Sequence, residues 1–199
     1  EWRAGGVARG EAHLISEHDG AVAFGGTPSD RSVLQAIEAL KERGYKVGLY
    51  PFLLMDVPAD NTLPDPYGAV AQPAYPWRGR ISVTPAAGQA ESADQTGAAG
   101  EQIDAFFGAA AVADFGVSGG LPDYSGPSEW SYRRFVLHHA KLAERAGGVD
   151  VFILGSELRG VTTARDSATT FPAVSAMQTL AADVRGMLGT ETTITYAAD

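Results

Sequence analysis

The chain has 199 residues, of which 45% are hydrophobic and 20% charged, a balance that suits one globular domain spanning residues 1–199. Its formal net charge of -9 and its lack of a basic run argue against a nucleic-acid partner. The absence of cysteine excludes disulfides and cysteine nucleophiles, and no apolar run approaches the ~20 residues of a membrane span. Because the first residue is not methionine, we expect the chain to start inside a longer polypeptide.

The amino-terminal part is predicted to form short strands at residues 12–16 and 21–24, followed by a helix. Thr27-Pro28-Ser29-Asp30 reads as an N-cap threonine, a proline at the first helical position and the acid of a capping box. Gly44 is expected to end this helix. The side chains predicted to be buried recur at helical spacing: Val33, Leu34, Ile37 and Leu40.

Residues 46–55 are apolar almost throughout, which is typical of a central strand in a parallel sheet. Pro51 indicates a bulge or an edge near the end of this strand. Asp56 follows the strand directly, where it is either a turn residue or a carboxylate of a site.

The second half of the chain is predicted to alternate between helices and strands, with helical patterns that are apolar on one side. In order, the expected elements are a helix over 101–113, a glycine-rich loop over 116–127, a helix over 129–146, a strand over 149–154, a helix over 172–188 and a strand over 192–197. In the second helix, His139 falls on the buried side and His138 near the surface. In the third, Val174 is expected to face inward.

Alternating strands and helices predict an α/β fold with a parallel sheet and helices packed outside it. No glycine-rich phosphate-binding motif follows a strand, which disfavours a nucleotide-binding sheet. Polar or acidic residues follow three predicted strands, an arrangement typical of (β/α)8 barrels. The sequence therefore predicts a partial TIM-barrel-like domain, about five-eighths of a barrel, with a long βα loop at residues 57–99.

The predicted strand ends at Leu154-Gly155, and Ser156 and then Glu157 follow it. Active sites of α/β proteins are built where parallel strands end, so Glu157 is the leading candidate for a catalytic carboxylate. The alternative is a salt bridge between Glu157 and Arg159 or an arginine of a neighbouring loop. Asp56 and Asp199, which follow two other predicted strands, are weaker catalytic candidates.

The long loop holds a second group of candidate residues, whose aromatic faces and guanidinium groups suit the binding of sugars. These are Tyr75, Trp77, Arg78 and Arg80. The alternative is a packed lid, with Trp77 buried and the arginines paired to Asp65 or Glu157. The later part of the loop, residues 84–100, is rich in small residues and is expected to be flexible.

The pattern of residues supports neither a metal site nor a serine-hydrolase active site. The four histidines show no spacing typical of metal ligands beside a carboxylate, so no metal or other cofactor is expected. Ser156 has no evident histidine base and lacks the glycine that completes a nucleophile elbow.

Several long motifs resemble the TIM-barrel-like domain of the large tail-baseplate protein of gene transfer agents and related tailed phages. They are residues 25–30 (GGTPSD), 50–56 (YPFLLMD), 75–80 (YPWRGR), 130–135 (WSYRRF), 155–160 (GSELRG) and 196–199 (YAAD). The resemblance implies a phage-like particle whose tail contains this protein, made in the bacterial cytoplasm, with other tail or baseplate proteins and a cell-envelope glycan as partners. It also implies that the domain continues beyond this chain.

That family is in turn similar to glycoside hydrolase barrels, in which a glutamate after the fourth strand is the general acid/base. The resemblance places Glu157 at that position and the second carboxylate outside this chain. Those hydrolases usually have asparagine before the glutamate, holding the sugar 2-hydroxyl, whereas this chain has Ser156. Ser156 and Arg159 therefore join the loop residues as candidates for substrate binding.

Two functions follow from these observations. The first is a glycoside hydrolase that acts on envelope polysaccharide and sets host specificity, with Glu157 as acid/base. The second is a catalytically inactive barrel with a structural or receptor-binding role in the tail, because fold alone does not establish activity. A second acid facing Glu157 across an open cleft would favour the hydrolase. A packed arginine in that space would favour the inactive barrel.

Overall fold

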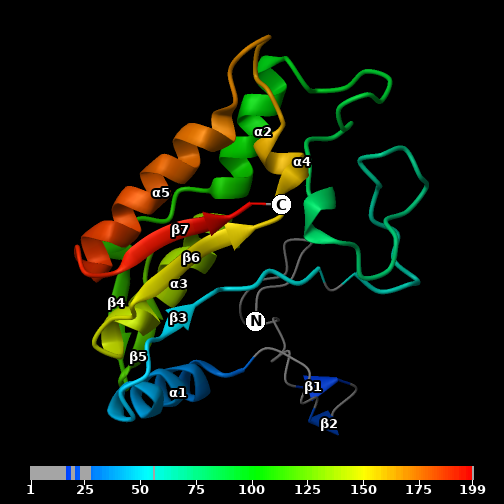
Figure 1. Cartoon of the computed structure of the whole chain (residues 1–199). Coiled ribbons are helices and arrows are strands. Elements are labelled where there is room, and N and C mark those ends of the chain that lie inside the picture. The colour runs from blue at the N-terminus through cyan, green and yellow to red at the C-terminus, as the bar shows by residue number, and fades with distance from the viewer. Residues whose placement is uncertain (1–16, 19–20, 23–27, 56, 199) are drawn as a thin grey trace.

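The computed structural model describes residues 17–18, 21–22, 28–55 and 57–198. Its centre is a three-stranded parallel sheet in the order β3 (Gly48–Leu49), β6 (Val151–Ser156) and β7 (Thr193–Ala197) (Figure 1). Val151 pairs with Gly48 on one side and with Thr193 on the other. The predicted α/β class with a parallel sheet is confirmed, and the strands do not close into a barrel within the described residues.

The remaining elements are helices, short 3-10 turns and two small hairpins. The longer helices are α1 (Asp30–Glu42), α2 (Gly97–Phe107), α3 (Tyr132–Arg145) and α5 (Pro172–Leu188). The short ones are α4 (Arg159–Thr162), η2 (Arg78–Arg80) and η3 (Val112–Asp114). The hairpins are β1 (Glu17–His18) with β2 (Ala21–Val22), and β4 (Phe115–Ser118) with β5 (Leu121–Tyr124).

The core lies where the helices meet the sheet. Helix α3 packs against α1, α2 and α5. Phe152 of β6 is fully buried beneath this helical layer, as are Val136 and Leu137 of α3. The Nζ atom of Lys41 at the end of α1 donates to the carbonyl of Gly148, 2.9 Å away, which ties α1 to the turn after α3.

Loop 57–96 lies beyond the ends of β6 and β7, on the side toward which both strands run (Figure 1). Its second part, predicted to be flexible, is fixed by contacts with the segment after α4. The backbone N–H of Gln95 donates to the carbonyl of Arg165 (2.7 Å), and Asp94 forms an ion pair with Arg165 (2.6 Å). This loop therefore covers the ends of the strands, where the candidate residues lie.

Several predicted boundaries were wrong. The strand predicted over residues 46–55 is regular only at Gly48–Leu49 and ends before Pro51, which has no N–H to donate to a ladder. Helix α1 begins at Asp30, with the Ser29 side chain accepting a hydrogen bond from Ser32 N–H (3.2 Å). The predicted N-cap Thr27 and the strand at residues 12–16 lie outside the described residues.

The region predicted as a helix over 101–113 and a loop over 116–127 also differs. Helix α2 runs from Gly97 to Phe107 and stops at Gly108, whose φ of 76° favours glycine. The predicted loop contains the antiparallel strands β4 and β5, joined by a turn at Gly119-Gly120. The hairpin was not predicted, because the segment is rich in glycine and each strand has only four residues, too few to show a clear alternation of apolar and polar side chains.

Three side chains lie on the other side of their helix from the prediction. Leu40 and Val174 are 42% and 51% exposed, so neither faces the core. His138, expected near the surface, is buried and bonds to Asp30 of α1 at 2.9 Å. His139 is core-facing as predicted, with its Nδ1 2.8 Å from the carbonyl of Phe135.

Candidate functional site

The end of β6 is shaped by close packing behind it. The hydroxyl of Tyr132 on α3 donates to the carbonyl of Leu154 at 2.7 Å. A Cβ atom at Gly155 would collide with that hydroxyl, so only glycine fits there. The pairing of β6 with β7 also shifts register between Ile153 and Ser156, a bulge of the kind found beside binding sites.

Glu157 follows this bulge with a left-handed backbone conformation, φ 53°. Such a conformation is costly for a residue other than glycine and is kept only where the surroundings determine it. The side chain is 40% exposed, and its Oε2 atom accepts a hydrogen bond from the indole Nε1 of Trp77 at 3.2 Å. The same oxygen forms an ion pair with Nη2 of Arg78. The predicted catalytic carboxylate therefore already has two partners from the long loop.

Arg78 fills the space beside the strand end. Its side chain is only 10% exposed, and its guanidinium carbon lies 3.9 Å from the centre of the Phe52 ring. Nη2 donates to the Ser156 hydroxyl at 3.0 Å, and Nε donates to the Ser156 carbonyl at 3.3 Å. The structure thus joins Glu157, Ser156, Trp77 and Arg78, which the sequence proposed separately.

Ser156 is buried, and its hydroxyl is hydrogen-bonded within the protein. Besides Arg78, its hydroxyl bonds to the hydroxyl of Tyr50. Close by, the hydroxyl of Tyr196 accepts a hydrogen bond from Leu158 N–H at 2.9 Å. Tyr50, Phe52 and Tyr196 were not among the predicted site residues, although all three lie within the motifs that carry the family resemblance. Their roles depend on contacts with residues at least 26 positions away in the chain, which no local pattern reveals.

Arg80 braces the loop from within. Its Nη2 atom lies 3.0 and 2.8 Å from the two carboxylate oxygens of Asp65, whose side chain is 5% exposed. The guanidinium also stacks over Tyr67, 4.5 Å from the ring centre. This pairing is the one that the packed-lid interpretation anticipated. Arg80 therefore holds the loop together through the Asp65 carboxylate and the Tyr67 ring.

The two loop aromatics remain open to solvent, contrary to the buried tryptophan of a fully packed lid. Trp77 is 46% exposed and Tyr75 is 66% exposed. Tyr75 has a left-handed backbone, φ 45°, and its N–H donates to the carbonyl of Val57 at 2.8 Å. Both rings are thus presented by a backbone that internal hydrogen bonds hold in place.

Trp77 forms part of the wall of a cavity of about 460 Å³, which we call the polar pocket. The pocket lies between η2 with its following strand-like segment and the short helix α4. Its lining residues are Tyr67, Trp77, Gly79, Arg80, Ser82, Val83, Ala87, Arg159, Gly160, Thr163 and Ala164. Arg159, predicted to bind substrate, is exposed at this wall, and its guanidinium makes no ion pair with any described residue.

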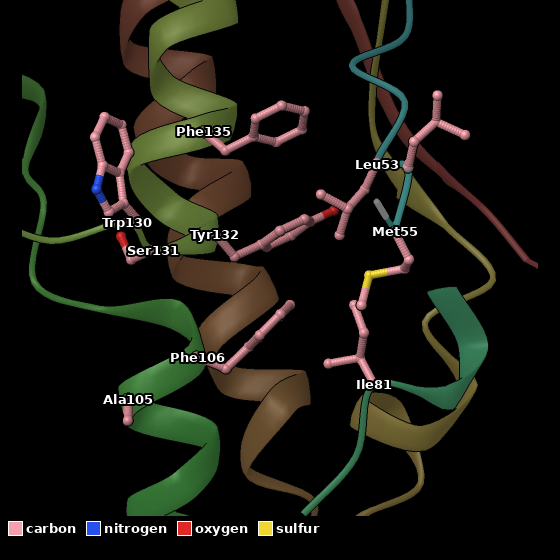
Figure 2. Close-up of a pocket in the computed structure, with 10 residues that line it drawn as sticks. Leu53, Met55, Ile81, Ala105, Phe106, Trp130, Ser131, Tyr132 and Phe135 are labelled. Carbon is pink, nitrogen blue, oxygen red and sulfur yellow. The ribbon is translucent and has the colours of Figure 1, made fainter. Parts of the chain in front are cut away.

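A second cavity, of about 240 Å³, is almost wholly apolar, and we call it the apolar pocket. In Figure 2, Leu53, Met55 and Ile81 lie across from Phe106, Tyr132 and Phe135. Burial raises the pKa of Tyr132 far above its usual range, so its hydroxyl keeps its proton and serves as a donor. Among the described residues, no carboxylate lines this pocket.

The two remaining catalytic candidates, Asp56 and Asp199, lie outside the described residues, so their roles stay predictions. Across the part of the chain that the structure describes, no group of three or more acidic or histidine side chains could hold a metal ion. Over the same residues, no helix is both long and apolar enough to cross a membrane.

Comparison with known families confirms the resemblance for part of the chain. Residues 130–199 match the model of the gene transfer agent TIM-barrel-like domain. The matched segment begins just before α3 and contains β6, Glu157, α5 and β7. Comparison with curated proteins gives no match.

Proposed function

We propose that this chain, a gene transfer agent TIM-barrel-like domain over residues 130–199, recognises carbohydrate as part of the tail of a phage-like particle. The family match supports the particle, and the arrangement of Trp77 supports the carbohydrate. In this proposal the domain binds envelope glycan without cleaving it. Glu157 acts as a positioning residue that orients the indole.

The single observation that carries the proposal is the fixed, exposed indole of Trp77. Its N–H is held by Glu157 at 3.2 Å, while nearly half of the side chain is open to solvent at the wall of the polar pocket. A flat aromatic face of this kind stacks on the C–H surface of a sugar ring. Because the ring is already oriented, little conformational entropy is lost when a sugar binds.

The contacts of Glu157 argue against hydrolysis. Glycoside hydrolysis needs two carboxyl groups, about 5–5.5 Å or about 6.5–9.5 Å apart, on either side of the scissile bond. The space beside Glu157 is filled by the guanidinium of Arg78, and Oε2 accepts from both Trp77 and Arg78. A packed arginine in this position is the arrangement under which we expected an inactive barrel.

The second candidate function is the glycoside hydrolase with Glu157 as acid/base. One observation favours it: Glu157 is partly exposed at the end of a parallel strand, with a left-handed backbone of the kind found at active sites. Its partner acid would be Asp56, Asp199 or a residue beyond this chain.

The test separates binding from cleavage. The chain is incubated with purified envelope polysaccharide of the host bacterium, and both binding and the release of new reducing ends are measured. We expect binding without reducing ends from the wild-type protein. Trp77→Ala should weaken binding at least about tenfold because the stacking surface is lost. Glu157→Gln, which keeps an acceptor oxygen for the indole, should bind within about threefold of wild type.

Tyr45→Ala is the matched control, because Tyr45 is also an exposed aromatic but lies at the other end of β3 from the pocket. It should bind as the wild-type protein does. Reducing ends that appear with wild type and vanish with Glu157→Gln would overturn the proposal in favour of the hydrolase. Absence of binding by a folded wild-type chain would leave only a structural role in the particle.

A further inference from the structure

We infer that the polar pocket selects acidic sugars, and specifically that Arg159 pairs with the single carboxylate of a uronic-acid-type residue. This inference rests on the proposed carbohydrate recognition and adds the chemical class of the glycan. It follows from the balance of charges around the pocket and from the way the backbone fixes Arg159.

Among the described residues, the pocket wall carries one positive charge without an acidic partner. Two of its lining residues are charged, Arg80 and Arg159. The charge of Arg80 is balanced by both carboxylate oxygens of Asp65. Arg159 has no ion-pair or side-chain hydrogen-bond partner among the described residues. The charges of the pocket wall therefore favour one anionic group in a ligand, and the N–H donors of the Arg159 guanidinium are available to bind it.

The neighbouring charges do not change this balance. Arg78, just outside the pocket, is paired with Glu157. Arg165, beyond Thr163, is paired with Asp94 at 2.6 Å. In the part of the chain that the structure describes, Arg78, Arg80 and Arg165 are thus each paired with a carboxylate, and Arg159 is not. A ligand carboxylate would not have to displace an internal partner to reach Arg159.

The backbone holds Arg159 in place beside Trp77. A Cβ atom at Gly160 would collide with the carbonyl of Ile81 and lie 3.0 Å from the carbonyl of Gly79, so α4 is pressed directly onto the loop. The N–H and hydroxyl of Thr163 both bond to the Arg159 carbonyl, at 3.0 and 2.7 Å. The guanidinium therefore extends from a fixed point on the same wall as the indole.

These two side chains suit one kind of ligand. The indole provides a face for the apolar side of a sugar ring, and the planar guanidinium provides two parallel donors that match a carboxylate. The net charge of -9 repels densely charged polyanions, whereas one carboxylate on an otherwise neutral ring is accepted by a local pair of donors. A sugar acid satisfies both requirements.

The experiment compares native envelope polysaccharide with the same polysaccharide after chemical reduction of its carboxyl groups to alcohols. Reduction removes carboxylates and leaves phosphate and sulfate groups untouched. We expect the wild-type chain to bind the native form at least about tenfold more tightly, in line with a charge-assisted pair of hydrogen bonds. Arg159→Ala should bind both forms about equally, and Arg159→Lys should keep part of the preference because it keeps the charge without the fork.

Arg31→Ala is the matched control, because Arg31 is exposed on α1 and changes the net charge equally without touching the pocket. It should retain the full preference. Equal wild-type binding to both forms, with Trp77→Ala weakening both, would overturn this inference and leave carbohydrate recognition intact. If Arg159→Ala weakened binding but carboxyl reduction had no effect, Arg159 would bind an anion other than a carboxylate, and the inference would be wrong. Absence of wild-type binding to either form would instead contradict the proposed function itself.

Discussion

The polar and apolar pockets lie on either side of the same short segment. They differ in whether the polar groups and ring faces that line them already have partners within the protein. Arg80 and Ser82 line the polar pocket, whereas Ile81 between them lines the apolar one. In the apolar pocket the Tyr132 hydroxyl is already bonded to Leu154. In the polar pocket the indole face of Trp77 and the guanidinium of Arg159 remain open.

The contrast between the two pockets separates side chains that stabilise the fold from side chains that can bind a ligand. Groups whose partners are all internal contribute to the folded state, and their loss lowers the free energy of unfolding. Groups that face solvent without an internal partner contribute little to stability and are available for a ligand. Substitutions in the two pockets should therefore have opposite consequences.

The largest loss of stability is expected on the apolar side, for Phe106→Ala. Phe106 stacks on Tyr132 at a ring distance of 5.1 Å and contacts Phe107 edge-on at 5.5 Å. Its removal enlarges the cavity and should lower the free energy of unfolding by about 2–3 kcal/mol, less than for a fully buried phenylalanine. Chemical denaturation measures this value, and polysaccharide binding of the folded variant should stay within about twofold.

Trp77→Ala should give the reverse result, with a loss of binding and a change in stability below about 1 kcal/mol. If Phe106→Ala weakened binding while remaining folded, or if Trp77→Ala destabilised the protein as strongly as Phe106→Ala, the two pockets would not be separable in this way.

A smaller effect is expected where the two sides meet, at Arg78. Arg78→Ala leaves the buried hydroxyl and carbonyl of Ser156 without this donor and removes the packing on Phe52. We expect a loss of about 2 kcal/mol in the free energy of unfolding. The ion pair with Glu157 contributes little of this, because that carboxylate is partly exposed.

Arg78→Lys distinguishes these contributions, since it keeps the charge but cannot reach Ser156 with two nitrogens. It should recover less than half of the lost stability. Full recovery by lysine would mean that the charge, and not the contacts with Ser156 and Phe52, is what the fold requires.

The smallest effect is a dependence of stability on pH that originates behind the apolar pocket. Burial, aided by His138, lowers the pKa of His139 from its usual value to about 4. Since the unfolded chain takes up the proton near pH 6.5, stability from this residue is complete above that pH and is lost as the pH falls toward 4. The loss between pH 7 and pH 5 should be about 1–2 kcal/mol.

Denaturation curves of wild type and His139→Gln, measured at pH 7, 6 and 5, test this expectation. Their difference should change with pH in the stated direction, while the neighbouring pair His138–Asp30 is unchanged in both proteins. A constant difference across the series would show that His139 is accessible to protons in the folded state.

Much of the fold could be predicted because its signals are local. Helix α5 begins at Pro172 and ends at Leu188, directly before Gly189, as expected, since proline suits the first helical turn and glycine accepts the left-handed conformation after the last one. Strands β6 and β7 were predicted from segments rich in β-branched and aromatic residues on either side of that helix. The hairpin β4–β5 was missed because its residues, such as Gly116 and Pro122, have low strand propensity.

The candidate site was predicted only in part. Periodicity and strand ends indicated Glu157, and composition indicated the loop aromatics. The partners of each residue could not be predicted, because the contact between Arg78 and Ser156 spans 78 positions in the chain. The choice between Asp65 and Glu157 as the partner of each arginine is a matter of tertiary packing, in which Arg78 took one carboxylate and Arg80 the other.

The class of fold, the resemblance to the gene transfer agent domain whose model residues 130–199 match, and the residue types gathered where the strands end could be predicted, because these depend on patterns within a few neighbouring residues. Which of those side chains are engaged internally, and which remain available to a ligand, depends on the tertiary structure. The physical reason is that hydrogen-bond partners and solvent exposure are set by contacts between distant segments. Arg78 and Arg159 are the same amino acid, yet one is packed against Glu157 and the other is open to the polar pocket.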